Sequence, residues 1–140
     1  MSKITAVVSF SLLALFSTPL TAFASSQKCL ADVVYAEARG ESRTGQIAVA
    51  EVVMNRVGKH GFPGTVCGVT RQKGQFSPRA RVSEGGAYQT AMNVAREVLQ
   101  GSAPKVTNGA TYFHTPAVSP SWSKRFTRTK KIGSHIFYRR

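Results

Sequence analysis

Residues 29–41 read Cys-Leu-Ala-Asp-Val-Val-Tyr-Ala-Glu-Ala-Arg-Gly-Glu, and this stretch predicts a helix that organises the rest of the chain. A helix over these residues aligns six side chains at the i, i+3 and i+4 spacing of one face: Leu30, Val33, Val34, Glu37, Ala38 and Glu41. Glu37 therefore lies in line with apolar residues that face a core, where burial disfavours the charged form of a carboxylate. Such a carboxylate can act as a general acid near neutral pH. The alternative is an ordinary, partly buried residue paired with an arginine.

Residues 1–24 have the pattern of a secretory signal peptide. A lysine at position 3 precedes an uncharged apolar run, and small residues at 22 and 24 mark a cleavage site. We therefore expect export to the periplasm, the cell wall or the medium, with residues 25–140 as one domain and 25–28 as a short tail before the first helix. The alternative is an uncleaved membrane anchor, which Pro19 and the short apolar run disfavour.

Both cysteines, Cys29 and Cys67, fall in the predicted mature chain. In an oxidising compartment such a pair is most simply one disulfide, which closes a loop of about 40 residues. Two free buried thiols are the alternative. The chain has no CxxC or HxxxH spacing, so we expect no metal and no cofactor.

The formal net charge is +13, from 19 basic and 6 acidic residues. Nucleic acid is the usual partner of so basic a protein inside the cell. For an exported chain we expect anionic cell-envelope polymers instead, no nucleic acid, and a monomer. The densest basic run, residues 124–131, is typical of a solvated surface.

The pattern after residue 41 predicts two further helices. The first covers residues 45–57, is capped by the segment that begins at Ser42, and is apolar on nearly every side, which is typical of a buried helix. Asn55 and Arg56 are expected to cap its end and face solvent. The second covers residues 83–99 and has an apolar stripe.

Between and after these helices the composition changes. Residues 58–81 are rich in glycine and charge and predict a long irregular loop, a kind of segment that is often functional. Residues 109–114 and 132–138 are aromatic and β-branched, which indicates extended segments near the C-terminus.

Acidic residues are few, which limits the chemistry that this chain can perform. The predicted mature chain has six: Asp32, Glu37, Glu41, Glu51, Glu84 and Glu97. On one helix, Glu37 and Glu41 share a face, and their repulsion helps to keep one of them protonated. Two carboxylates placed in this way cannot flank a scissile bond from opposite sides, as paired-carboxylate glycosidases require. The sequence predicts a single working acid.

Eight motifs in order resemble the SleB/CwlJ family of cell wall hydrolases, typified by spore cortex-lytic enzymes. They are residues 36–41 (Ala-Glu-Ala-Arg-Gly-Glu), 45–50, 55–57, 62–69, 75–77 (Gln-Phe-Ser), 110–114, 119–122 and 132–139. They extend over nearly the whole predicted mature chain. One such motif would be weak, whereas eight in register are specific.

The resemblance implies an α+β fold: a mostly helical, lysozyme-like or lytic transglycosylase-like single domain with a small β element near the C-terminus. It implies action on the glycan strands of peptidoglycan, with Glu37 as the catalytic residue. In a lytic transglycosylase, Glu37 would protonate the glycosidic oxygen after N-acetylmuramic acid and then accept a proton from the sugar's 6-hydroxyl, which attacks the anomeric carbon. Simple hydrolysis by water is the alternative.

Five residues are candidates for a supporting or substrate-binding role: Glu41, Gln75, Tyr112, His114 and Trp122. Polar groups can orient sugar hydroxyls, and aromatic faces can stack on a pyranose ring. Core packing is the alternative for Tyr112 and Trp122, a hydrogen-bonded structural role for His114, and a salt bridge to Arg39 or Arg43 for Glu41. We expect His135 to be structural.

Two other functions compete with this interpretation. A zinc-dependent N-acetylmuramoyl-L-alanine amidase would draw its ligands from His114, His135 and Glu37, although no HExxH motif supports it. A non-catalytic envelope-binding module would bind the wall and tolerate Glu37→Gln.

Overall fold

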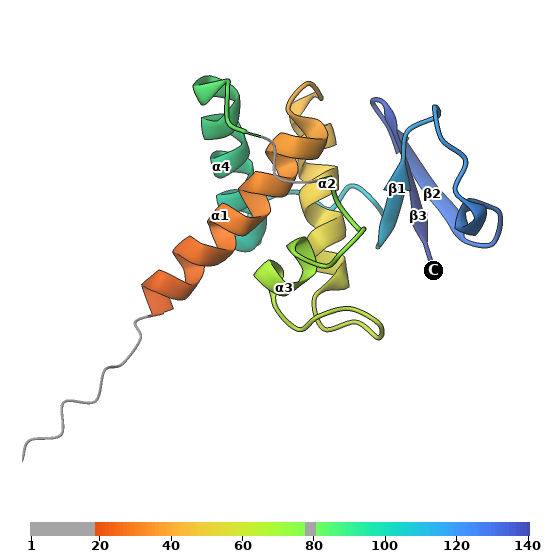
Figure 1. The fold of residues 1–140 in the computed structure, drawn as a ribbon, viewed down its shortest axis with the longest axis horizontal. Coiled ribbons are helices and arrows are strands. Elements are labelled where there is room, and N and C mark those ends of the chain that lie inside the picture. The colour runs from red at the N-terminus through yellow and green to blue at the C-terminus, as the bar shows by residue number, and fades with distance from the viewer. Residues whose placement is uncertain (1–18, 78–80) are drawn as a thin grey trace, which may run out of the picture.

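The computed structural model describes residues 19–77 and 81–140, which form a helical part and a small sheet beside it (Figure 1). The elements in chain order are α1 (Pro19–Ala38), α2 (Arg43–Arg56), α3 (Val66–Thr70), α4 (Gly85–Leu99), β1 (Tyr112–His114), the 3-10 helix η1 (Ser121–Lys124), β2 (Thr127–Ile132) and β3 (His135–Arg139). The predicted class, a mostly helical α+β domain with a small β element near the C-terminus, is confirmed.

Helix α1 begins and ends earlier than the sequence predicts. It starts at Pro19, so residues 25–28 are helical rather than a tail. It ends at Ala38, whose carbonyl accepts the Glu41 N–H at 2.9 Å in the turn that follows. Glu37 therefore lies in the last turn, whereas Glu41 lies beyond the helix and does not share a helix face with it.

The predicted signal peptide stays a prediction. Residues 1–18 lie outside the described residues, and residues 19–24 form the first turns of α1. Within the described parts of the chain, no helix is long and apolar enough to cross a membrane.

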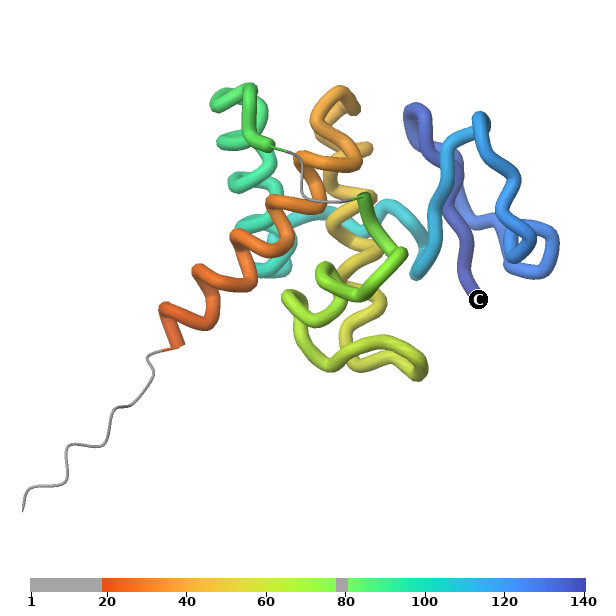
Figure 2. Tube along the Cα trace, in the orientation of Figure 1, coloured from red at the N-terminus to blue at the C-terminus, as the bar shows by residue number. Residues whose placement is uncertain are grey.

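Helix α2 forms the centre of the molecule. It begins after Ser42, whose hydroxyl accepts the Gly45 N–H at 3.3 Å, as the capping pattern predicts. Residues 47–50 and 52–53 are almost completely buried, as expected for a helix that is apolar on all sides. The Cα trace shows α2 between the α1–α4 pair and the sheet (Figure 2).

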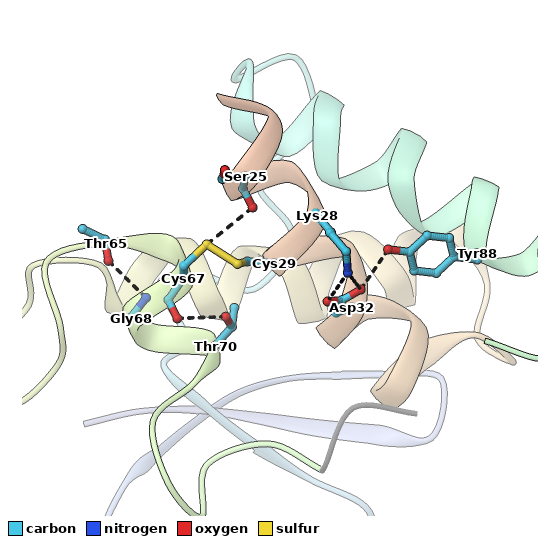
Figure 3. The surroundings of a disulfide bond; sticks show 9 residues. All are labelled: Ser25, Lys28, Cys29, Asp32, Thr65, Cys67, Gly68, Thr70 and Tyr88. Carbon is cyan, nitrogen blue, oxygen red and sulfur yellow. Dashed lines mark hydrogen bonds and ion pairs between the residues drawn. A yellow bond between two sulfur atoms is a disulfide. The ribbon is translucent and has the colours of Figure 1, made fainter. Parts of the chain in front are cut away.

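A disulfide between Cys29 and Cys67 joins α1 to α3 and confirms the predicted bridge (Figure 3). Helix α3 itself was not predicted, because this segment was expected to be irregular. Thr65 caps it by accepting the Gly68 N–H at 3.0 Å. The Cys67 sulfur also lies 3.4 Å from the Ser25 carbonyl oxygen, a packing contact because a disulfide sulfur carries no hydrogen.

The sheet has three antiparallel strands in the order β1–β3–β2. The prediction of one closing strand over residues 132–138 is wrong at its start. Ile132 ends β2, Gly133 and Ser134 form a tight turn, and β3 begins at His135. Gly133 has φ +55°, a left-handed conformation that favours glycine in such turns.

Two polar residues of α2 attach the chain that leads into β1. The Glu51 carboxylate is buried and accepts the Val106 N–H at 2.7 Å and the Thr107 hydroxyl at 2.6 Å. The Asn55 side-chain amide donates to the Ala110 carbonyl at 2.9 Å. A buried carboxylate is stable when hydrogen bonds satisfy it, so these contacts fix where β1 begins relative to α2.

Candidate active site

A cleft of about 460 Å³ lies where the helical part meets the sheet. Its lining comes from the ends of α1 and α2, from the loop after α3, and from the sheet with its connections. The lining residues are Glu37, Arg56, Gly74, Gln75, Phe76, Ser77, Phe113, His114, Thr115, Val118, Pro120 and His135. Among the predicted site residues, the structure brings Glu37, Gln75 and His114 together here.

Glu37 presents a half-buried carboxylate to this cleft from the last turn of α1. Its Oε1 accepts the backbone N–H of Ser77 at 2.6 Å. It forms no ion pair with any described residue, and the neighbouring Arg39 pairs with Glu84 at 3.4 Å instead. The alternative of an arginine-paired Glu37 therefore finds no support in the described chain, and one carboxylate oxygen has no described hydrogen-bond partner.

Arg56 links the loop after α3 to the sheet, and its expected position on the surface is wrong. Its side chain is buried, with Nε donating to the Thr111 carbonyl at 2.7 Å and Nη1 donating to Gln75 Oε1 at 3.2 Å. The guanidinium carbon also lies 4.9–5.1 Å from the centroids of three rings: Phe62, Phe76 and Tyr112. Burial lowers the pKa of Arg56 to about 10, so the group remains a cation at neutral pH.

Gln75 is an exposed residue of the cleft wall whose side-chain oxygen is occupied by Arg56. Its amide nitrogen donates no hydrogen bond to any described residue. Because an amide nitrogen is a hydrogen-bond donor, Gln75 offers a donor to a ligand while Arg56 fixes its orientation.

His114 uses both ring nitrogens within the protein. Nδ1 donates to the Thr115 carbonyl at 2.7 Å, because a carbonyl oxygen can only accept. In the neutral imidazole, Nε2 then accepts the Tyr138 hydroxyl at 3.1 Å. The ring also stacks on Tyr138, so the hydrogen-bonded structural role accounts for His114, and its ring forms part of the cleft wall.

Tyr112 and Trp122 do not line this cleft. Their ring centroids lie 5.1 Å apart in an aromatic cluster beside it, where Tyr112 also lies 4.8 Å from Phe126. The structure thus separates these two predicted sugar-stacking residues from Glu37.

Glu41 lies outside the cleft as well. Its carboxylate accepts hydrogen bonds from the hydroxyl of Ser134 and, at 3.3 Å, from the backbone N–H of Ser134. The hydroxyl bond holds the pKa of Glu41 below its usual value. Both predicted salt bridges are absent from the described chain, since Arg39 and Arg43 pair elsewhere. Through these hydrogen bonds, Glu41 links the β2–β3 turn to the segment that precedes α2.

His135 lines the cleft although the sequence indicated only a structural role. It follows the turn that Glu41 holds, and its residue surface is 3% exposed. Its ring meets Phe113 edge to face with centroids 5.0 Å apart, and Nδ1 has no hydrogen-bond partner among the described residues. Burial lowers the pKa of His135, and the charges of Glu41 and Glu37 oppose this shift in part.

The sequence contained a signal for both missed cleft residues. Arg56 is a charge at the end of a helix whose interior is mostly apolar, and His135 occupies an inward position of a strand. In the described ranges, no three His, Cys, Asp or Glu side chains are placed to hold a metal ion, so the alternative amidase finds no ligand set there.

Together, the helical core, the small sheet and the one carboxylate among the described residues that line the cleft between them define an α+β domain with a single candidate acid. Residues 40–138 match the family described as Cell Wall Hydrolase, and the chain belongs to this family. The resemblance read from the eight motifs is thereby confirmed.

Curated relatives include spore cortex-lytic enzymes. That of Bacillus cereus is 40% identical over 115 residues, which cover 77% of this chain and 42% of the relative. That of Bacillus subtilis strain 168 is 38% identical over 118 residues, which cover 79% of this chain and 36% of the relative. The chain thus spans less than half the length of these relatives.

Two solved structures share the fold. The catalytic domain of the Bacillus cereus SleB protein superposes with a TM-score of 0.70 at 34% identity, covering 83% of this chain and 91% of that one. The catalytic domain of the germination-specific lytic transglycosylase SleB from Bacillus anthracis superposes with a TM-score of 0.65 at 33% identity, covering 91% of this chain and 100% of that one.

Proposed function

We propose that this protein cleaves the glycan strands of peptidoglycan after N-acetylmuramic acid, as a lytic transglycosylase that uses Glu37 first as acid and then as base. The observation that carries the proposal is that Glu37 is the one acidic side chain among the described residues lining the cleft. A transglycosylase needs only one such group, whereas paired-carboxylate glycosidases need two. The name of the Bacillus anthracis relative supports the same reaction.

The first step is general acid catalysis. Protonated Glu37 gives its proton to the glycosidic oxygen, and the bond from that oxygen to the anomeric carbon of N-acetylmuramic acid breaks. The resulting carboxylate accepts a hydrogen bond from the Ser77 N–H, which lies 2.6 Å from Oε1.

In the second step the same carboxylate acts as base. It takes the proton of the sugar's 6-hydroxyl while that oxygen attacks the anomeric carbon, so a 1,6-anhydro sugar forms and no water is consumed. Glu37 is protonated again and ready for another cycle. In this proposal Gln75, which Arg56 orients, donates a hydrogen bond to the sugar.

The location and partners follow from charge and redox chemistry. The disulfide supports an oxidising compartment outside the cytoplasm. The net charge of +13 supports attraction to anionic envelope polymers, which weakens as salt is added.

Muropeptide analysis after digestion of purified peptidoglycan tests the proposal. We expect anhydro-muropeptides; reducing-end muramic acid would indicate hydrolysis by water, and free stem peptides would indicate an amidase. Glu37→Gln should lower the rate by about 100-fold or more, the usual contribution of a general acid. Glu84→Gln makes the same change at an exposed site and serves as the matched control. Full lytic activity of Glu37→Gln would refute the role of Glu37.

A further inference from the structure

A second pocket, of about 410 Å³, lies on the sheet side of the molecule. It is lined by Tyr112 of β1, Trp122 of η1, Arg125, Phe126 and Arg140. The Trp122 and Phe126 rings stack at 25° with centroids 5.6 Å apart. All three aromatic residues are half-buried, so each retains some accessible surface.

This pocket adjoins the cleft through two side-chain contacts. Tyr112, in the pocket, lies under the guanidinium of Arg56, which lines the cleft. Trp122, in the pocket, meets the ring of His114, which lines the cleft, with centroids 5.6 Å apart. The cleft and the pocket are therefore neighbours that share a wall of packed side chains.

Both charged side chains that line the pocket are basic. Arg125 and Arg140 are exposed, and neither forms an ion pair with any described residue. No Asp or Glu follows Glu97 in the chain, so every charged side chain of the sheet part is basic. Guanidinium groups bind carboxylates with two parallel hydrogen bonds, and aromatic faces pack on the apolar faces of sugars.

We propose that this second pocket is a binding site for the stem-peptide-bearing part of peptidoglycan, in which a sugar ring stacks on Trp122 and a peptide carboxylate pairs with Arg125 and Arg140. The proposal rests on the proposed function, because it places the same polymer in both sites. It gives the enzyme a preference for glycan strands that carry peptides over bare glycan. It also assigns to Trp122 a sugar contact that the cleft itself does not provide.

The position of Trp122 supplies the assay, because it is the chain's only tryptophan. The full chain carrying Glu37→Gln, which slows turnover, is titrated with two probes while tryptophan emission is recorded. One probe is the disaccharide–tetrapeptide of peptidoglycan, and the other is an uncharged oligomer of N-acetylglucosamine. We expect the first to shift the emission and to bind more tightly, by about tenfold, since two exposed ion pairs are lost with the second.

The double variant R125A/R140A should weaken binding of the disaccharide–tetrapeptide by about tenfold and leave binding of the uncharged oligomer unchanged. R71A/R96A removes the same charge from exposed positions that line neither the cleft nor the second pocket, and serves as the matched control. Equal affinities in the two double variants, or equal affinities for the two probes, would overturn the proposal. If R125A/R140A does not fold, as judged by circular dichroism, R125A alone is measured by the same criteria.

Cleavage by the unaltered chain is measured separately, so the two proposals can fail independently. Arginine-dependent binding without glycan cleavage would reject the enzymatic function and keep the site. Glycan cleavage with arginine-independent binding would reject the site and keep the function.

Discussion

Removing the Cys29–Cys67 disulfide is expected to cost a large part of the stability of the domain. The two cysteines are 38 positions apart, and their bond closes that segment in the unfolded chain. The chain-entropy relation for a loop of this length gives about 13 cal/mol/K, or about 4 kcal/mol at 25 °C. Small domains have total stabilities of about 5–15 kcal/mol, so the loss is severe. At about 4 °C per kcal/mol, the Tm should fall by about 15 °C.

The assay compares the native chain with C29A/C67A by urea denaturation and by thermal melting. Alanine suits both positions because it is small and leaves no thiol, and Cys29 is buried. Reductant should lower the Tm of the native chain and leave that of C29A/C67A unchanged, which provides the internal control. A loss below about 1 kcal/mol would refute the reasoning, since it would mean that closing this loop restricts the unfolded chain far less than the entropy relation requires.

Three further predictions concern Arg56, Glu41 and His135. Arg56→Lys keeps the charge but loses the hydrogen bonds to Thr111 and Gln75. The free energy of unfolding, measured by urea denaturation, should therefore fall by about 2–3 kcal/mol, and lytic activity should fall with it. Unchanged stability and activity would contradict the linking role of Arg56. Glu41→Gln should destabilise by about 1 kcal/mol at neutral pH. Because the folded pKa of Glu41 is lowered, this difference should shrink as the pH falls below about 4.5 and be lost once the pH is below the folded pKa. A difference that persists at such acid pH would exclude the charge as its cause. Because the pKa of His135 is lowered in the folded protein, the unfolded chain binds a proton at higher pH than the folded chain, and stability should fall as the pH drops below about 6.5. Between about pH 7.5 and about pH 5, the Tm of His135→Gln should therefore fall less than the Tm of the native chain. An equal fall in Tm for the two proteins would contradict the assignment.

The three longer helices were predictable from local signals. Ser42 marks the start of α2, and its uniform apolar composition correctly indicates a buried helix. Helix α3 was missed because five residues are too few for a helical period to show, although Thr65 is a capping residue. Strand β2 was missed because its charged side chains suggested only a solvated surface. The strand is indeed mostly exposed, and its Thr and Ile residues are the ones that favour an extended backbone.

The candidate site was predicted only in part, because most of its contacts join distant parts of the chain. Glu37 could be found from its position among apolar residues. The place of Arg56 depends on Thr111, which is 55 positions away, and that of Glu41 on Ser134, which is 93 positions away. The periodicity of a sequence gives no information on contacts between such distant residues. Arg56, which is buried, was therefore expected at the surface, and Glu41, which binds a turn, was assigned to the site.

The order in which the cleft residues occur along the chain has a consequence for biosynthesis. Glu37, Arg56 and Ser77 emerge early from the ribosome, whereas the opposite wall, from Phe113 to His135, belongs to the last thirty or so positions. A sheet that pairs β1 with β3 cannot form before β3 has been made, and non-local pairings of this kind are slow. A chain that ends before β3 therefore lacks both His135 and the strand that pairs with β1.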